Sequence, residues 1–168
     1  MTDEILNKEN ITHFLCYGTL WGALRHGDLL PWKREFDFCI INEELLWRMD
    51  ENYFRRLFRF RKMEMEYSNS QGVYSIWLEE KGKSNGILRL YVFDRFENQM
   101  RRIGLNRLIP IPVAADAADA FPMQLINRPL NKIKLKALSF PAPREGAEIQ
   151  KYHYKDNWWK EIKPNGCS

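Results

Sequence analysis

The sequence lacks the features that mark several familiar classes of protein. Its three cysteines match no zinc-binding spacing, and its three histidines are too scattered to form a histidine metal site. No serine stands in a Gly-x-Ser-x-Gly sequence, so nothing supports a serine hydrolase. No segment is apolar over the length that a membrane-spanning helix needs. There is also no internal repeat, and no linker divides the chain.

The cysteines are Cys16, Cys39 and Cys167, an odd number. A disulfide between Cys16 and Cys39 is compatible with the sequence, but spacing alone does not decide it. Buried free thiols are the expected state, because cysteine commonly packs as a small hydrophobic residue. The first residues are polar and acidic, so no signal peptide is visible, and any targeting segment would lie outside this sequence.

The composition is typical of one folded domain over residues 1–168. Hydrophobic residues make up 45% of the 168 residues and charged residues 29%, which argues against disorder. The formal net charge of +4 suits anionic partners such as nucleotides, phosphates or nucleic acid. The plainer alternative is a soluble surface with a small excess of basic residues.

Hydrophobic periodicity and turn residues predict an alternation of helices and strands. Helices are expected over 3–15, over 20–26 with Thr19 as cap and Gly27 as stop, from Asn42 to about 61, and within 145–160. Strands are expected over 35–41, 63–67, 73–78, 87–93 and 132–136, with 73–78 and 87–93 forming a hairpin. Residues 101–131 contain four prolines and are expected to be mostly loops. The predicted fold class is a mixed α/β domain of the α+β type.

The residues from 17 to 37 carry the clearest chemical signal. Gly18 and Thr19 lead into a helix whose first turn presents backbone N–H groups suited to a phosphate. Glu35 and Asp37 follow on the next strand, two positions apart, so both carboxylates lie on one face, with backbones roughly 7 Å apart. Two such carboxylates can hold a divalent cation that neutralises substrate phosphates.

This segment resembles the LicD/fukutin branch of the nucleotidyltransferase fold. That branch carries a Gly-Thr/Ser-Leu-Leu-Gly run, then an arginine, an Ile-Pro-Trp sequence and two acids spaced by one hydrophobic residue. The matching positions are Gly18, Thr19, Leu20, Gly22, Arg25, Gly27, Pro31, Trp32, Glu35 and Asp37. Weaker similarity extends over 88–93 and 132–158, and the end of the chain, 154–158 with 163–166, resembles fukutin more than the bacterial choline-phosphate transferases.

The resemblance implies a nucleotidyltransferase-like mixed β-sheet flanked by helices, and a phospho-alcohol transfer. A CDP-linked donor would pass ribitol phosphate or phosphocholine to a glycan hydroxyl, with Mg²⁺ or Mn²⁺ as cofactor. Glu35 and Asp37 would be the catalytic and metal-binding residues. The substrate-binding residues would be Gly18, Thr19, Gly22, Arg25, Lys33 and Tyr91. A fukutin-like protein with a separate targeting segment would lie in the Golgi lumen, and otherwise the cytoplasm is expected.

The sequence departs from the family pattern at two positions. Lys33 stands where many members have a further acid, and it could contact phosphate as a point charge. Tyr91 replaces the third carboxylate that the family carries on a later strand, and we expect it to point into the cleft of Glu35 and Asp37. Asp94 lies on the opposite face by strand parity unless a bulge intervenes.

Three functions therefore remain open at this stage. The first is the metal-dependent transferase. The second is a weakened or inactive relative that binds a nucleotide-sugar, a glycan or a partner enzyme. The third is a basic nucleic-acid-binding module, suggested by five basic residues between 55 and 62, but no aromatic-interleaved RNA motif accompanies them, and a specific nucleic-acid partner is not expected.

Overall fold

The computed structural model describes residues 1–78, 85–106, 109–112 and 119–160. The helices are α1 (Thr2–Lys8), α2 (Tyr17–His26), α3 (Asn42–Arg48), α4 (Glu51–Arg59) and α5 (Gly146–His153), with a 3-10 turn η1 (Met123–Ile126). The strands are β1 (His13–Leu15), β2 (Phe36–Ile41), β3 (Met63–Ser68), β4 (Val73–Leu78), β5 (Asn85–Phe96), β6 (Gln99–Asn106), β7 (Ile109–Pro112), β8 (Ala120–Pro122), β9 (Asn131–Leu135) and β10 (Leu138–Ala142). This is the mixed α/β composition that the sequence predicts.

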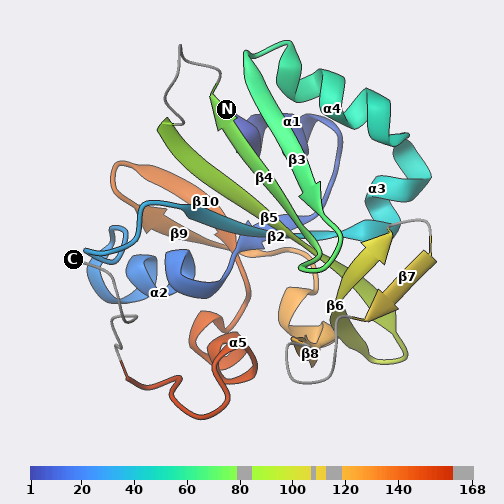
Figure 1. Ribbon diagram of the computed structural model, residues 1–168. Coiled ribbons are helices and arrows are strands. Elements are labelled where there is room, and N and C mark those ends of the chain that lie inside the picture. The colour runs from blue at the N-terminus through green and yellow to red at the C-terminus, as the bar shows by residue number, and fades with distance from the viewer. Residues whose placement is uncertain (79–84, 107–108, 113–118, 161–168) are drawn as a thin grey trace.

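A curled mixed sheet forms the centre of the molecule (Figure 1). Its strand order is β1-β2-β5-β4-β3, and β6 continues from the far end of β5 to pair with β7 and β8. The pairing of β2 with β5 is parallel, whereas the other pairs in the sheet are antiparallel. The long β5 therefore places its middle residues, 88–93, beside β2, next to the paired acids Glu35 and Asp37 at the start of that strand.

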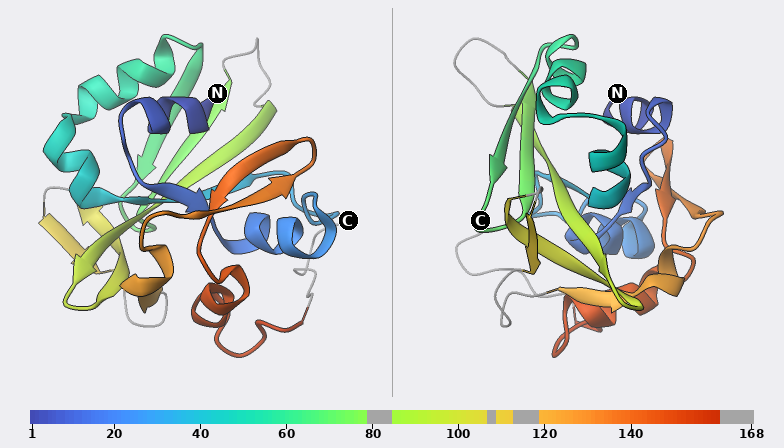
Figure 2. Two further views of the ribbon diagram at one scale, coloured as in Figure 1. Left: turned by 180° about the vertical axis from the view of Figure 1, so that it is seen from behind. Right: turned by 90° about the vertical axis from the view of Figure 1, so that its right-hand side faces the viewer.

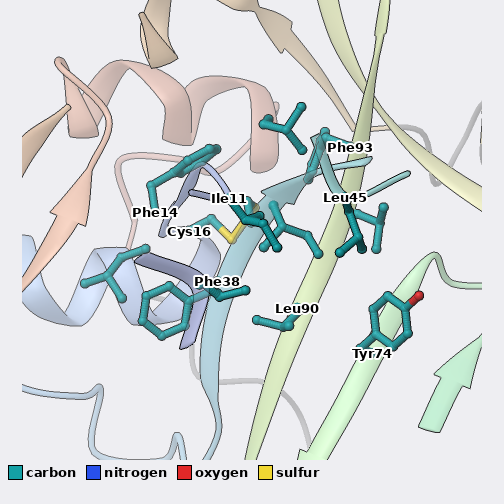
Figure 3. Close-up of a cluster of buried hydrophobic side chains, with 14 of the residues drawn as sticks. Ile11, Phe14, Cys16, Phe38, Leu45, Tyr74, Leu90 and Phe93 are labelled. Atoms are coloured by element: carbon teal, nitrogen blue, oxygen red, sulfur yellow. A yellow bond between two sulfur atoms is a disulfide. The ribbon is translucent and has the colours of Figure 1, made fainter. Parts of the chain in front are cut away.

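The helices lie on one side of this sheet, together with the separate β9–β10 hairpin (Figure 2, right). The buried side chains between these layers come from both halves of the chain, as Figure 3 shows for Phe14, Phe38, Leu90 and Phe93. Phe38 is 2% exposed and packs edge-on against Phe140 of β10. Phe38 is therefore a residue of the hydrophobic core.

Cys16 and Cys39 form a disulfide inside this core, so the expectation of free thiols is wrong for this pair. The reason lies in the tertiary structure, which brings the two cysteines together. Cys16 follows β1, which pairs with β2, and its backbone N–H donates to the Asp37 carbonyl at 3.2 Å. The two cysteine Cα atoms are therefore 5.9 Å apart, within the usual range for a disulfide. Cys167 lies outside the described residues.

The predicted helix over 3–15 is too long. α1 ends at Lys8, and Asn10 takes a left-handed φ of 55° that turns the chain. Residues 13–15 then form β1, which pairs antiparallel with β2 and buries Phe14 and Leu15. Their spacing fits a helix, but pairing with a distant strand decides the outcome.

The predicted helix from Asn42 to about 61 is divided in two. α3 ends at Arg48, and the Asp50 carboxylate accepts a hydrogen bond from the Tyr53 N–H at 2.7 Å, which starts α4. Asn42 is the first residue of α3, and its side-chain amide donates to Asp94 at 2.9 Å. Tyr53 on α4 is 39% exposed.

The later strands differ most from the prediction. The strands at 63–67, 73–78 and 87–93 and the hairpin are confirmed, but residues 101–131 contain most of β6, β7 and β8. Pro141 lies in β10, which pairs with β9 and with no other strand among the described residues, so a residue without an N–H is tolerated there. The helix within 145–160 stops at His153, and Trp159 beyond it is exposed. Residues 163–166, part of the segment that resembles fukutin, lie outside the described residues.

Candidate functional site

Thr19 connects the first turn of α2 to the start of β2. Its hydroxyl accepts a hydrogen bond from the Asp37 N–H at 2.8 Å and donates to the Glu35 carbonyl at 3.4 Å. Thr19 is fully buried, and Cys16, three residues earlier, is the N-cap of α2. Thr19 is therefore not the predicted helix cap; it holds the strand that carries the two acids against the helix.

Gly22 and Gly27 shape the connection between α2 and β2. A Cβ on Gly22 would lie 2.3 Å from the Asp28 carbonyl oxygen and 2.8 Å from the Leu30 nitrogen, so only glycine lets this loop cross the helix. Gly27 ends α2 in a left-handed conformation with a φ of 64°, as the sequence predicts. The two glycines turn the chain back toward the N-terminal end of α2.

A cavity of about 480 Å³ opens beside this helix–strand unit, within the size range of small-molecule sites. It is lined by Tyr17, Gly18, Trp21, Arg25, Leu30, Trp32, Lys33, Glu35, Asp37, Arg89, Tyr91, Tyr154, Asn157 and Lys160. Six predicted site residues are in this lining: Gly18, Arg25, Lys33, Glu35, Asp37 and Tyr91. Thr19 and Gly22 do not line the cavity, since both are buried and held in the contacts described above.

The parallel pairing of β2 and β5 brings the strand residues of the site together. Asp37 is opposite Arg89, and Tyr91 is opposite Cys39 in the same register. Side chains two positions apart share a face, so Arg89 and Tyr91 both face the cavity beside Asp37. The prediction that Tyr91 points into the cleft of Glu35 and Asp37 is confirmed. Asp94 is absent from the described lining and accepts from Asn42 instead.

Two cationic side chains contact the two carboxylates. The Lys33 ammonium lies 2.7 Å from Asp37 Oδ2 and 3.9 Å from Glu35 Oε2. The Arg89 guanidinium lies 3.6 Å from Glu35 Oε1. The Asp37 side chain is 1% exposed and that of Lys33 is 13% exposed, whereas Glu35 remains 30% exposed. Asp37 is thus a buried, paired carboxylate, and Glu35 is the acid that an incoming ligand can reach.

Gly18 leaves room for the lysine. A Cβ on Gly18 would lie 2.9 Å from the Lys33 Cδ and 3.1 Å from its Cε. The methylene stem of Lys33 therefore lies directly over Gly18, on the side where a larger residue would carry its own side chain. This contact directs the ammonium toward the carboxylates.

The surroundings shift the pKa values of Asp37 and Tyr91. Burial raises the pKa of Asp37 above its ordinary value, and the Lys33 ammonium and Arg89 oppose this rise. Burial and the charge of Asp37 raise the pKa of Tyr91, and its hydrogen bond from Arg89 opposes that rise. A phenol starts from a value near 10, so Tyr91 stays protonated at neutral pH. It offers neither the metal ligand nor the base that a third carboxylate would supply.

The arrangement of these side chains does not fit a divalent cation. Within the described ranges, no group of three His, Cys, Asp or Glu side chains is placed to hold a metal ion. Asp37 Oδ1 is buried without a hydrogen-bond partner and could accept a cation, but Oδ2 already contacts Lys33. A metal shared by Glu35 and Asp37 would have to displace an ammonium that contacts both acids.

A buried polar network behind Tyr91 escaped the sequence analysis. The Tyr17 hydroxyl donates to Asp119 and accepts from Arg102, and His153 Nδ1 lies 3.1 Å from Asp119. The Tyr17 ring packs on Tyr91 with centroids 4.4 Å apart. This network supports the floor of the cavity. No local pattern signals it, because its members come from α2, β6, α5 and the residue before β8.

Comparison with known proteins places the chain in a family. A search of curated protein sequences finds no match. Within the described part of the chain, no helix is long and apolar enough to cross a membrane. A sequence model described as "LicD/FKTN/FKRP, nucleotidyltransferase domain" matches residues 10–145, a range that includes Gly18, Lys33, Glu35, Asp37 and Tyr91. The match covers most of the chain, and this protein belongs to the LicD/FKTN/FKRP nucleotidyltransferase-domain family.

Proposed function

We propose that this protein transfers a phospho-alcohol from a CDP-linked donor to a hydroxyl of a glycan, breaking the pyrophosphate bond of the donor and releasing CMP. Membership of the LicD/FKTN/FKRP family supports the reaction class. The observation that carries the proposal for this chain is the cavity itself. It gathers two acidic and four basic side chains with five aromatic rings, in a volume suited to a nucleotide-sized ligand.

The cations of the cavity are suited to the donor's pyrophosphate. Arg25 and Arg89 carry planar guanidinium groups that match phosphate oxygens in pairs, and Lys33 adds a point charge. The first turn of α2, with Tyr17 and Gly18 in the lining, adds N–H groups that no helical carbonyl accepts. An anionic ligand would therefore bind near the start of α2.

The aromatic residues are suited to the nucleotide base or the acceptor. Trp21, Trp32 and Tyr154 line the cavity, and the Arg25 guanidinium lies 4.0 Å from the centre of the Trp21 ring. Flat rings beside cations offer stacking surfaces to a pyrimidine or a sugar. Among the two acids, Glu35 is the accessible one, and we assign it to accept the proton of the attacking hydroxyl. Asp37 would position the cations of the site.

The cofactor that the family resemblance implies, Mg²⁺ or Mn²⁺, stays a prediction. A divalent ion held by Glu35 and Asp37 would neutralise phosphate charge during transfer. As the side chains are arranged, Lys33 and Arg89 supply positive charge at the same carboxylates. The proposed steps above need only groups that the chain itself provides.

The second candidate is a relative that binds the donor without transferring it. Tyr91 favours it, because a neutral phenol replaces the carboxylate that the family places on this strand. A basic nucleic-acid-binding module gains no support. Two arginines of the basic cluster on α4 pair with nearby acids, Arg55 with Glu51 and Arg59 with Glu64.

Incubation with CDP-ribitol or CDP-choline and a glycan acceptor tests the proposal. Mass spectrometry of the acceptor should show the added phospho-alcohol, and Glu35→Gln should remove the product. Glu66→Gln is the matched control, because Glu66 is an exposed acid on β3 away from the cavity. Donor binding without product would favour the second candidate. Absence of both donor binding and product would refute the proposal.

A further inference from the structure

Lys33 is held in the site more firmly than a surface lysine. Its side chain is 13% exposed, its stem covers Gly18, and its ammonium contacts the carboxylates of both Glu35 and Asp37. The ammonium group of a surface lysine usually stays in water, and a lysine buried to this degree needs a negatively charged partner. These contacts hold the Lys33 ammonium at one place in the site, between Gly18 and the two carboxylates.

Asp37 needs a cation at this position. Its side chain is 1% exposed, and a carboxylate buried to that degree is costly unless it is paired. The Lys33 ammonium at 2.7 Å meets this need, and Arg89 contacts the other acid at 3.6 Å. These two side chains provide the positive charge that a metal ion would otherwise bring to the pair.

We propose that Lys33 is the resident cation of this site, so that its ammonium replaces a divalent ion at Glu35 and Asp37. Nucleotide-free protein then has little affinity for divalent cations. An ammonium has three N–H donors. Asp37 Oδ2, at 2.7 Å, accepts one of them, whereas Glu35 Oε2, at 3.9 Å, is an ion-pair partner beyond hydrogen-bond distance. N–H donors therefore remain for a phosphate oxygen, so the cavity binds phosphates without added metal; this second consequence rests on the proposed function.

The first test measures Mn²⁺ binding to nucleotide-free protein at pH 8 by electron paramagnetic resonance. Wild type, Lys33→Arg and the control Lys134→Met should bind Mn²⁺ weakly and equally, since Lys134 is an exposed residue of β9. Lys33→Met keeps the stem over Gly18 but removes the charge. It should bind Mn²⁺ about tenfold more tightly or better, because both carboxylates lose their ammonium.

The second test measures CDP binding by calorimetry in EDTA and in Mn²⁺. Wild type should bind CDP equally in both buffers. Lys33→Met should lose about tenfold or more in EDTA, the loss expected for one charged contact to a phosphate, and Mn²⁺ should restore part of it. Circular dichroism of every variant confirms that the fold is intact.

The outcomes separate this proposal from the proposed function. If wild type binds CDP in neither buffer, the proposed function fails, and Mn²⁺ binding to nucleotide-free protein still decides the role of Lys33. Equal Mn²⁺ affinity in wild type and Lys33→Met would overturn the resident-cation proposal. If Lys33→Met does not fold, wild type is compared with Asp37→Asn. Tight wild-type Mn²⁺ binding that Asp37→Asn abolishes would overturn the proposal, and weak binding by both would support it.

Discussion

The hydrogen bonds of Thr19 hold the helix and the acid-bearing strand together, and Thr19→Val removes them at nearly constant volume. The buried Thr19 hydroxyl is the acceptor for the Asp37 N–H at 2.8 Å. Valine leaves this N–H without that acceptor in a place that water does not reach. An unsatisfied buried donor costs about 1–3 kcal/mol, and the bond from Thr19 to the Glu35 carbonyl is long at 3.4 Å, so it adds little.

We therefore expect Thr19→Val to lower the free energy of unfolding by about 1–3 kcal/mol. For a domain of this size that is a loss in Tm of roughly 2–12 °C. Urea unfolding monitored by tryptophan fluorescence measures the change, with the Cys16–Cys39 disulfide kept oxidised in each protein. CDP binding should weaken as well, because the carboxylates lose part of their fixed position.

Thr19→Ser is the matched control, since it keeps the hydroxyl and removes only a methyl group. It should stay more stable than Thr19→Val, although valine is the better match in volume. If Thr19→Val is as stable as wild type, or if Thr19→Ser is the weaker of the two, the connection between α2 and β2 does not depend on this hydroxyl.

The remaining predictions concern the core, the loop crossing and the missing carboxylate. Phe38→Ala should cost about 3–5 kcal/mol in urea unfolding, because Phe38 is 2% exposed in the core, and unchanged stability would contradict the β2 register. Gly22→Ala should cost about 1–3 kcal/mol or more, since its Cβ would overlap the Asp28 carbonyl; a fully stable variant would show that the loop can move. Tyr91→Asp should raise Mn²⁺ affinity by adding a third carboxylate to the site, whereas Tyr91→Phe should leave it unchanged, and an unaltered affinity in Tyr91→Asp would show that the position does not reach the metal.

The sequence predicts the helices and strands that are determined by the pattern of their own residues. Phe36, Phe38 and Ile40 alternate with polar or smaller residues, and this alternation predicts β2 within one residue. Gly27 is followed by a loop and does end α2 in a left-handed turn. The acids of the motif and Tyr91 reach one cavity because β2 and β5 are adjacent and parallel. The family resemblance implies only that the strand of Tyr91 faces the paired acids.

Elements that depend on distant partners were not predictable in the same way. β1 has three residues and exists because β2 pairs with it. β10 tolerates Pro141 because, among the strands that the structure describes, it is paired with β9 alone. The disulfide depends on the separation of the Cys16 and Cys39 Cα atoms, which spacing along the chain does not determine. These features require knowledge of which strands meet.

The same distinction applies to the residues of the site: some could be placed from the sequence and others could not. Arg89 stands two positions before Tyr91 on a predicted strand, so strand parity was enough to place it in the cleft. The position of Lys33 was not accessible, because it depends on the space over Gly18 and on the burial of Asp37. A lysine two positions before an acid points to solvent in most proteins.

Donor binding at the cavity is the central claim, and calorimetric titration with CDP-ribitol and CDP-choline tests it most directly. We compare wild type with Arg89→Met, which removes a cation of the cavity, and with Arg95→Met, which removes an exposed arginine further along β5. The account predicts that wild type and Arg95→Met bind at least one donor alike, and that Arg89→Met binds it about tenfold more weakly or worse. No donor binding by wild type, or equal affinities in all three proteins, would contradict it.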